Sequence, residues 1–173
     1  MQSPNFKKQA RSDSERARLV CVDCGFVAYE NPKVIVGSVI EDRGRILLCR
    51  RAIQPSKGRW TIPAGYLELN ETLEDGARRE ALEEAGAMIS LRGILDVFSL
   101  AAESQVLVFF DAFLTDDTFR PGPESEDVRQ FHWDAIPWDD LAFPSVNRIL
   151  QSWNEKRTDI VRPSSFIEPG TCS

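Results

Sequence analysis

The chain has 173 residues, of which 42% are hydrophobic, and this is enough to build the core of one domain. Its net charge of −6 and pI near 4.9 argue against binding to nucleic acid or to anionic membranes, because those surfaces require a basic protein field. No apolar run has the length of a membrane span, and residues 1–19 lack the apolar segment of a secretory signal. We expect an intracellular protein, cytoplasmic by default, with an organelle as the alternative.

Residues 1–32 form an N-terminal segment marked by the cysteine pair Cys21 and Cys24. The spacing Cys-Val-Asp-Cys-Gly is half of a zinc ribbon, but a structural zinc site needs four ligands. The other two cysteines, Cys49 and Cys172, each stand alone in the sequence. Three interpretations stay open: a remnant without metal, a zinc ion shared across a homodimer or with another ligand, and a redox pair. Zinc is therefore the less favoured metal for this chain.

Residues 33–155 carry alternating strand and helix patterns and are the expected catalytic domain, followed by a tail over residues 156–173. Branched and aromatic residues predict five strands and Pro144 opens a terminal helix. The predicted strands are 34–40, 45–51, 87–100, 106–114 and 128–133, and the terminal helix is 144–153. A short strand is expected within the loop 58–63. These elements predict an α/β fold in which helices flank a mixed sheet.

A further helix is predicted after Glu71, because Thr72 and Asp75 fit a capping box and Gly86 fits a C-terminal stop. Its apolar stripe consists of Leu73, Ala77, Ala81 and Ala85. Glu84 falls within this stripe and Glu80 lies beside it, whereas a solvated acidic face would lie opposite the alanines. Both carboxylates should therefore point inward, where an unpaired charge is unfavourable and requires a cation or a proton.

The segment GYLELNETLEDGARREALEEAGA, residues 65–87, resembles the Nudix box. That box reads Gly, five residues, Glu, seven residues, then Arg-Glu-apolar-any-Glu-Glu-any-Gly-apolar. Its fixed positions are occupied here by Gly65, Glu71, Arg79, Glu80, Glu83, Glu84 and Gly86. The resemblance implies a Nudix-type α/β/α sandwich with a mixed β-sheet. It also implies that Glu71 and Arg79 pair to hold the loop against the helix.

The resemblance further implies a cluster of Mg²⁺ or Mn²⁺ ions held by Glu80, Glu83, Glu84 and the carbonyl of Ala64. Oxygen ligands of this kind suit hard cations better than zinc. The general base is Glu83 or Glu84 of the box, or Glu124 of the loop 121–127, which is our first choice and an additional metal ligand. Glu126 in the same loop has an equally good interpretation as part of a solvated acidic turn.

Residues that could bind a nucleotide substrate precede the box. Arg50 and Arg51 could hold its phosphates. Trp60 and Phe109 could stack on a base or a flavin, although aromatic residues on strands more often belong to the core.

Four segments outside the box narrow the resemblance to a group of Nudix hydrolases that carry an N-terminal zinc ribbon and include FAD and ADP-ribose pyrophosphatases. The segments are CVDCGFVAYENPKVIVGSVIE, LLCRRAIQPSKGRWTIPAGYLE, PGPESEDVRQF and IPWDDLAFPSV. The resemblance to this group implies that the protein hydrolyses FAD or ADP-ribose and releases AMP. The alternatives are an NADH or other nucleotide pyrophosphatase and a non-catalytic nucleotide sensor. NADH is less favoured because Phe98 to Ala102 departs from the segment that such enzymes carry after the box.

Overall fold

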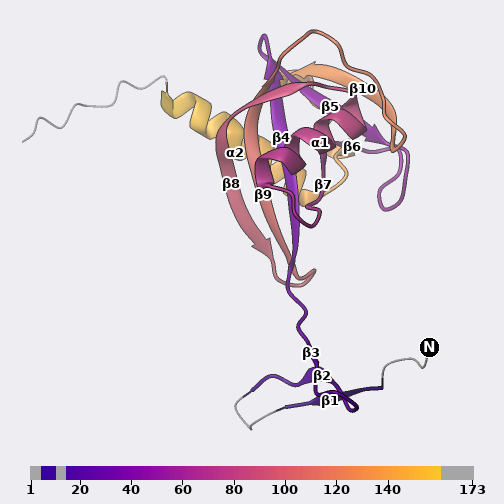
Figure 1. Ribbon diagram of the computed structural model, residues 1–173. Coiled ribbons are helices and arrows are strands. Elements are labelled where there is room, and N and C mark those ends of the chain that lie inside the picture. The colour runs from indigo at the N-terminus through magenta and orange to yellow at the C-terminus, as the bar shows by residue number, and fades with distance from the viewer. Residues whose placement is uncertain (1–4, 11–14, 161–173) are drawn as a thin grey trace, which may run out of the picture. The chain divides into compact units, whose positions relative to one another are not determined.

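The computed structural model describes residues 5–10 and 15–160, with side chains described up to residue 157. The chain divides into two compact units, of which one ends at Pro32 and the other begins at Lys33 (Figure 1). In the described ranges, no helix is long and apolar enough to cross a membrane.

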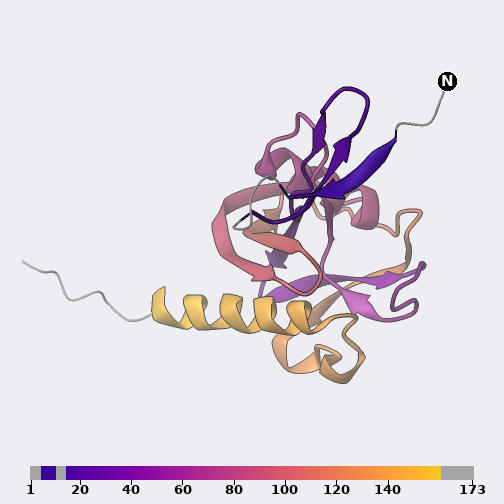
Figure 2. The ribbon, with the colours of Figure 1, turned by 90° about the horizontal axis from the view of Figure 1, so that it is seen from below.

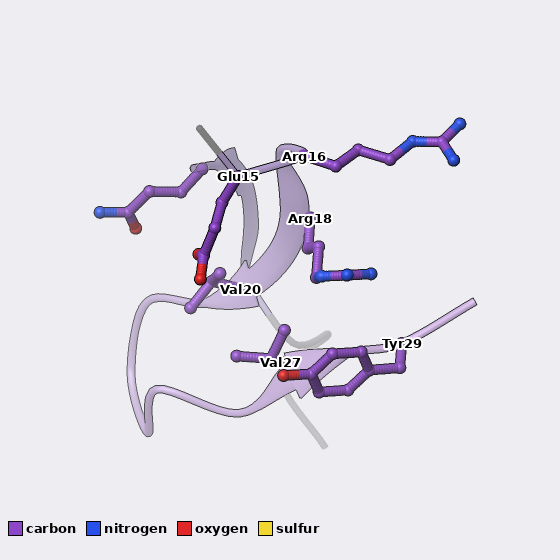
Figure 3. A pocket seen from close by; sticks show the side chains of 7 residues that line it. Glu15, Arg16, Arg18, Val20, Val27 and Tyr29 are labelled. Carbon is purple, nitrogen blue, oxygen red and sulfur yellow. The ribbon is translucent and has the colours of Figure 1, made fainter. Parts of the chain in front are cut away.

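The N-terminal unit is a small antiparallel sheet that the sequence analysis did not predict. Its strands β1 (Phe6–Gln9), β2 (Arg18–Cys21) and β3 (Val27–Ala28) pair in that order. A tight turn after Cys21 is closed by the Gly25 N–H, which donates to the Cys21 carbonyl at 2.9 Å. On the sheet, the Arg18 guanidinium lies 4.8 Å from the ring centre of Tyr29 and lines a small pocket of about 120 Å³ (Figure 3).

The second unit is built on a mixed sheet. Its main strands are β4 (Lys33–Asp42), β5 (Arg45–Arg51), β8 (Ile89–Leu100), β9 (Gln105–Leu114) and β10 (Ser125–His132). They lie in the order β10-β5-β4-β9-β8, with β4 and β9 parallel and the other neighbours antiparallel. The five predicted strands are thus confirmed, with ends that differ by a few residues. Arg43 and Gly44 form the hairpin turn between β4 and β5 with positive φ angles of 50° and 79°, as a tight hairpin requires.

Two short strands lead from β5 to the loop that precedes α1 (Leu73–Ala85). Strand β6 (Trp60–Thr61) pairs with β5 and fulfils the expectation of a short strand in this loop. Strand β7 (Ala64–Tyr66) was not predicted and pairs antiparallel with β4. Through this pairing, the main chain of Ala64 and Gly65 is fixed against the sheet.

Helices cover both faces of the sheet, α1 (Leu73–Ala85) in front and α2 (Pro144–Ile160) behind (Figures 1 and 2). Alternate residues of β5 face opposite layers, as the pleat of a strand dictates. Ile46 and Leu48 join the core with α2, whereas Leu47 and Cys49 join the core with α1. The predicted α/β/α sandwich with a mixed sheet is therefore confirmed.

The C-terminal part begins with two short 3-10 helices, Trp133–Ala135 and Trp138–Asp140, which precede α2. Helix α2 buries Val146, Ile149, Leu150 and Trp153. It extends beyond the predicted end at Trp153 to Ile160, so the first residues of the expected tail are helical. The rest of that tail, including Cys172, lies outside the described residues.

Candidate active site

Helix α1 presents two acidic side chains to the interior. The Thr72 hydroxyl caps its start by accepting from the Asp75 N–H at 3.1 Å, and Gly86 ends it in the left-handed conformation with φ 57°. These caps confirm the predicted bounds. Ala77, Ala81 and Ala85 are fully buried, and Glu80 and Glu84 are only 8% and 7% exposed. The helical periodicity therefore placed both carboxylates on the correct face.

Glu84 is the more deeply buried acid, and its oxygen Oε2 accepts a hydrogen bond from the Ala64 N–H at 3.0 Å. Burial raises its pKa to about 7; the bond from Ala64 opposes this rise and the charge of Glu80 adds to it. Cys49 lies near this carboxylate, and burial together with the charge of Glu84 raises the pKa of its thiol. Glu84 is thus a carboxylate that is poorly compensated by the protein alone.

Arg79 is the cation closest to this acidic surface. Its guanidinium contacts Glu71 at 2.8 Å and 3.0 Å, Glu80 at 2.6 Å and Glu83 at 3.1 Å. It also donates to the carbonyl of Tyr66 at 3.0 Å. Glu71 in turn accepts from the Glu68 N–H at 3.1 Å, so this ion pair holds the loop to the helix. The contacts to Glu80 and Glu83 were not predicted, although the i,i+4 spacing of Arg79 and Glu83 signals one of them.

Gly65 allows the acidic helix to approach the loop. A Cβ at this position would overlap the Glu80 carboxylate and lie 2.5 Å from its carboxyl carbon. The missing side chain therefore leaves room for a carboxylate directly against the main chain.

The loop before β10 brings a fourth acid to the site. The turn that contains Glu124 is bonded to α1, because the Gly122 N–H donates to the Glu84 carbonyl at 3.1 Å. The negative charge of Glu124 adds to the rise in the pKa of Glu80 and Glu84 that their burial causes. Glu126 instead lies 3.8 Å from Lys57 and 4.0 Å from Arg50. Glu126 is thus paired with basic side chains, and Glu124 as the general base and a metal ligand stays a prediction.

The predicted substrate-binding residues occupy different environments. Arg51 carries its charge near Glu84 and opposes the rise in the pKa of that group. Arg50 donates to the Gly58 carbonyl at 2.7 Å and faces Glu126. Trp60 is 7% exposed and packs edge-to-face on Phe131 in the core beside α2, with ring centres 4.9 Å apart. Phe109 is likewise buried in that core. Both aromatic residues thus belong to the core, which is the alternative that the sequence left open, and stacking of Trp60 on a substrate stays a prediction.

The residues present fit a hard divalent cation. Glu80, Glu83, Glu84 and Glu124 offer only oxygen donors, which are the ligands that Mg²⁺ or Mn²⁺ prefers. Glu80 and Glu84 are buried, and burial raises the pKa of Glu84 to about 7, so a bound cation would stabilise its ionised form. Within residues 5–10 and 15–160, no three Asp, Glu, His or Cys side chains form a ready-made cage. In this structure Glu80 and Glu83 are paired with Arg79, at 2.6 Å and 3.1 Å.

The cysteine pair of the N-terminal unit is the other metal candidate. Main-chain N–H groups of Cys24 and Asp23 lower the pKa of the Cys21 thiol. Among the described residues, neither cysteine forms a disulfide and no third ligand completes a site with them. Zinc at Cys21 and Cys24 stays a prediction.

A pocket of about 780 Å³ borders Glu83 on the outer side of α1. Its walls are largely apolar, and they come from the end of α1, the start of β8 and the loop before β10. The lining residues are Leu82, Glu83, Gly86, Met88, Thr118, Phe119, Arg120, Pro121, Gly122 and Pro123. A pocket of this volume is in the range of small-molecule sites.

Comparison with known proteins decides the family. The family model of the NUDIX domain matches residues 31–152, more than half of the chain. The chain belongs to the Nudix family. One similar solved structure is the crystal structure of a NUDIX hydrolase from Nitrosomonas europaea, whose sequence is 43% identical to this chain. The match covers 90% of this chain and 89% of the Nitrosomonas chain, with a TM-score of 0.87.

Two curated relatives of this Nudix chain have named activities. An ADP-ribose pyrophosphatase from Methanocaldococcus jannaschii is 38% identical over 71 residues, 41% of this chain and 42% of the relative. An NAD-capped RNA hydrolase, NudC, from Vibrio atlanticus is 30% identical over 151 residues, 86% of this chain and 54% of the relative. The chain therefore spans about half the length of these relatives.

Proposed function

We propose that this Nudix protein is a divalent-metal-dependent pyrophosphatase that hydrolyses the internal diphosphate of a nucleotide compound. The preferred substrate is ADP-ribose or FAD, and AMP is one product. The observation that carries this proposal is the burial of Glu80 and Glu84 at the Gly65 main chain, with the turn that contains Glu124 hydrogen-bonded to the end of the same helix. The similarity to an ADP-ribose pyrophosphatase supports the substrate class.

The reaction transfers a phosphoryl group to water. Bound Mg²⁺ or Mn²⁺ would neutralise charge on the diphosphate oxygens and activate the attacking water. Glu80, Glu83 and Glu84 would hold the metal, together with the Ala64 carbonyl. Glu124 would accept a proton from the water as its oxygen bonds to phosphorus. The bridging P–O bond breaks, and the two products each carry a terminal phosphate.

Basic residues and the pocket beside Glu83 would position the rest of the substrate. Arg51, whose charge already acts on Glu84, is suited to a phosphate oxygen close to the acids. The apolar wall formed by Leu82, Met88 and Phe119 is suited to a ring or sugar at one end of the substrate. Binding at a distance from the scissile bond would hold the diphosphate over the carboxylates.

A hydrolysis screen in Mg²⁺ and in Mn²⁺ tests the proposal. ADP-ribose, FAD, NADH, ATP and oxidised dGTP would be offered to the whole chain, and the products would be separated by chromatography. We expect AMP from ADP-ribose or FAD, and loss of the reaction in Glu84→Gln. If none of the five compounds is hydrolysed but ADP-ribose binds tightly, the result would instead favour a non-catalytic nucleotide sensor.

An NAD-type substrate is the second candidate. It is favoured by the NAD-capped RNA hydrolase, whose similarity extends over 86% of this chain. In the same screen, NADH would then be cleaved faster than ADP-ribose, with AMP and reduced nicotinamide mononucleotide as products. The acidic site would perform the same chemistry, so the two candidates differ in what binds outside the diphosphate.

A further inference from the structure

We propose that Gly122 is a positioning residue for catalysis. Because it lacks a side chain, the loop of residues 120–124 can form hydrogen bonds with the last turn of α1, and this contact holds Glu124 near Glu80 and Glu84. The inference rests on the proposed function and names a residue outside the Nudix box.

The end of α1 needs partners from elsewhere in the chain, because the last carbonyl groups of a helix have none within it. No basic side chain lies in its last turn. The loop supplies main-chain donors instead. The Arg120 N–H donates to the Ala85 carbonyl at 2.7 Å, and the Gly122 N–H donates to the Glu84 carbonyl at 3.1 Å. The loop is therefore bonded to the same residue that contributes the most buried carboxylate of the site.

The approach of loop and helix at Gly122 leaves no space for a side chain. A Cβ there would overlap the carbonyl oxygen of Glu83, lie 2.8 Å from its carbonyl carbon and 3.4 Å from the Glu84 Cα. All three atoms belong to the main chain of a helix, which cannot rotate away as a side chain would. Any other residue must move the loop away from α1.

Glu124 follows only two positions later and is fixed on its other side by the sheet. The Ala52 N–H donates to the Glu124 carbonyl at 2.8 Å, and Ser125 is paired with Arg51 at the start of β10. The Ser125 N–H also donates to the Gly122 carbonyl at 3.1 Å, which closes the turn that contains Glu124. Glu124 is thus held between a contact to α1 and a contact to β5, so a shift at Gly122 changes its distance from the helix.

The test compares Gly122→Ala with Gly44→Ala. Gly44 is a matched control because it lies in the β4–β5 hairpin turn, where an added Cβ meets nothing within 4 Å and only the positive φ is strained. We expect Gly122→Ala to lower kcat and Mn²⁺ affinity each by about tenfold or more, the effect typical of a lost supporting contact. Gly44→Ala should lose thermal stability while retaining both kcat and Mn²⁺ affinity. A folded Gly122→Ala variant with wild-type kcat and Mn²⁺ affinity would overturn the inference.

A double variant shows whether Gly122 acts through Glu124. In a Glu124→Gln background, Gly122→Ala should change kcat by less than about twofold, because residues acting as one unit are not additive. A full additional loss in the double variant would assign Gly122 a general structural role and overturn the inference.

Pro123→Gly covers the case in which Gly122→Ala does not fold. It loosens the link between Gly122 and Glu124 without adding an atom, and we expect lower kcat and weaker Mn²⁺ binding. Wild-type values for Pro123→Gly would contradict the inference. Mn²⁺ binding, followed by calorimetry, needs no substrate, so it still decides the role of Gly122 if no compound is hydrolysed. In that case the proposed function alone fails.

Discussion

Arg79 donates two parallel hydrogen bonds to the Glu71 carboxylate, from Nε at 2.8 Å and from Nη2 at 3.0 Å. This fork holds the pKa of the Glu71 carboxyl below its ordinary range. The remaining guanidinium nitrogen, Nη1, contacts Glu80 and Glu83, so one side chain links the loop anchor to two of the proposed metal ligands. Its geometry therefore couples the shape of the loop to the charge of the acidic helix.

The first prediction concerns this coupling. Arg79→Ala and Glu71→Ala should each lower kcat/KM, and the double variant should lose less than the sum, with a coupling free energy of about 0.5–3 kcal/mol. Arg79→Ala should be the more damaging single change, because Arg79 also contacts Glu80 and Glu83. A double-mutant cycle on kcat/KM and on urea unfolding measures both quantities.

Arg78→Ala is the control for the cycle. Arg78 precedes Arg79 on the same helix, is exposed, and contacts Asp75 at 3.2 Å as a surface pair, which contributes about 0–1 kcal/mol. It should leave kcat/KM unchanged. Strict additivity between Arg79 and Glu71 would show that the observed fork does not act as a unit.

Local patterns predicted the acidic helix well and its surroundings poorly. Thr72 and Gly86 fixed its ends, and the spacing of Glu80 and Glu84 relative to the alanines gave the buried face, because capping and helical periodicity depend on neighbours in sequence. The burial of Trp60 against Phe131 and the fit of Gly122 against Glu83 depend on segments that meet only in the folded sheet. No local pattern contains those contacts.

The second prediction is that Glu84→Gln preserves the fold and removes most turnover. The amide oxygen can still accept from the Ala64 N–H, but the negative charge offered to a cation is gone. We expect kcat to fall by roughly 100-fold or more, about 2.7 kcal/mol in activation free energy. Glu74→Gln, an exposed position in the first turn of the same helix, is the control and should retain kcat. Equal kcat values for the two variants would show that Glu84 has no part in catalysis.

The third prediction follows from the raised pKa of Glu84, about 7 against an ordinary value near 4.5. Between these pH values the folded, metal-free protein keeps a proton that the unfolded chain has lost. The associated stability is fully present below pH 4.5 and is lost as the pH rises through 7. At about 1.4 kcal/mol per pKa unit, the loss is roughly 3 kcal/mol.

Urea unfolding in EDTA from pH 4.5 to 8.5 measures this loss. The free energy of unfolding of the wild type should fall with pH relative to that of Glu84→Gln, whose side chain does not titrate. Adding Mn²⁺ should reverse the trend, because the ionised carboxylate is the form that binds metal. If the difference in the free energy of unfolding between the two proteins stays constant across this pH range, the raised pKa of Glu84 is contradicted.

The fourth prediction separates the two metal candidates. Activity should be lost with Mg²⁺ and Mn²⁺ removed and should return with either ion, since the acids of α1 offer only oxygen donors. It should survive complete removal of zinc and the double substitution of Cys21 and Cys24 by serine. Metal analysis before and after chelation, followed by assays with single metals, checks each step. Recovery with zinc alone would contradict the assignment of the acidic site.

The fifth prediction is that compounds with an internal diphosphate are better substrates than triphosphates. Groups on both sides of the diphosphate can contribute binding energy that positions the scissile bond, whereas a triphosphate offers a group at one end only. ADP-ribose and FAD should therefore exceed ATP and oxidised dGTP in kcat/KM. Because the difference arises from positioning, shortening the substrate should lower kcat as well as raise KM. Steady-state kinetics on these four compounds measure the order, and a clear preference for either triphosphate would reject the substrate class while retaining the chemistry of the acidic helix.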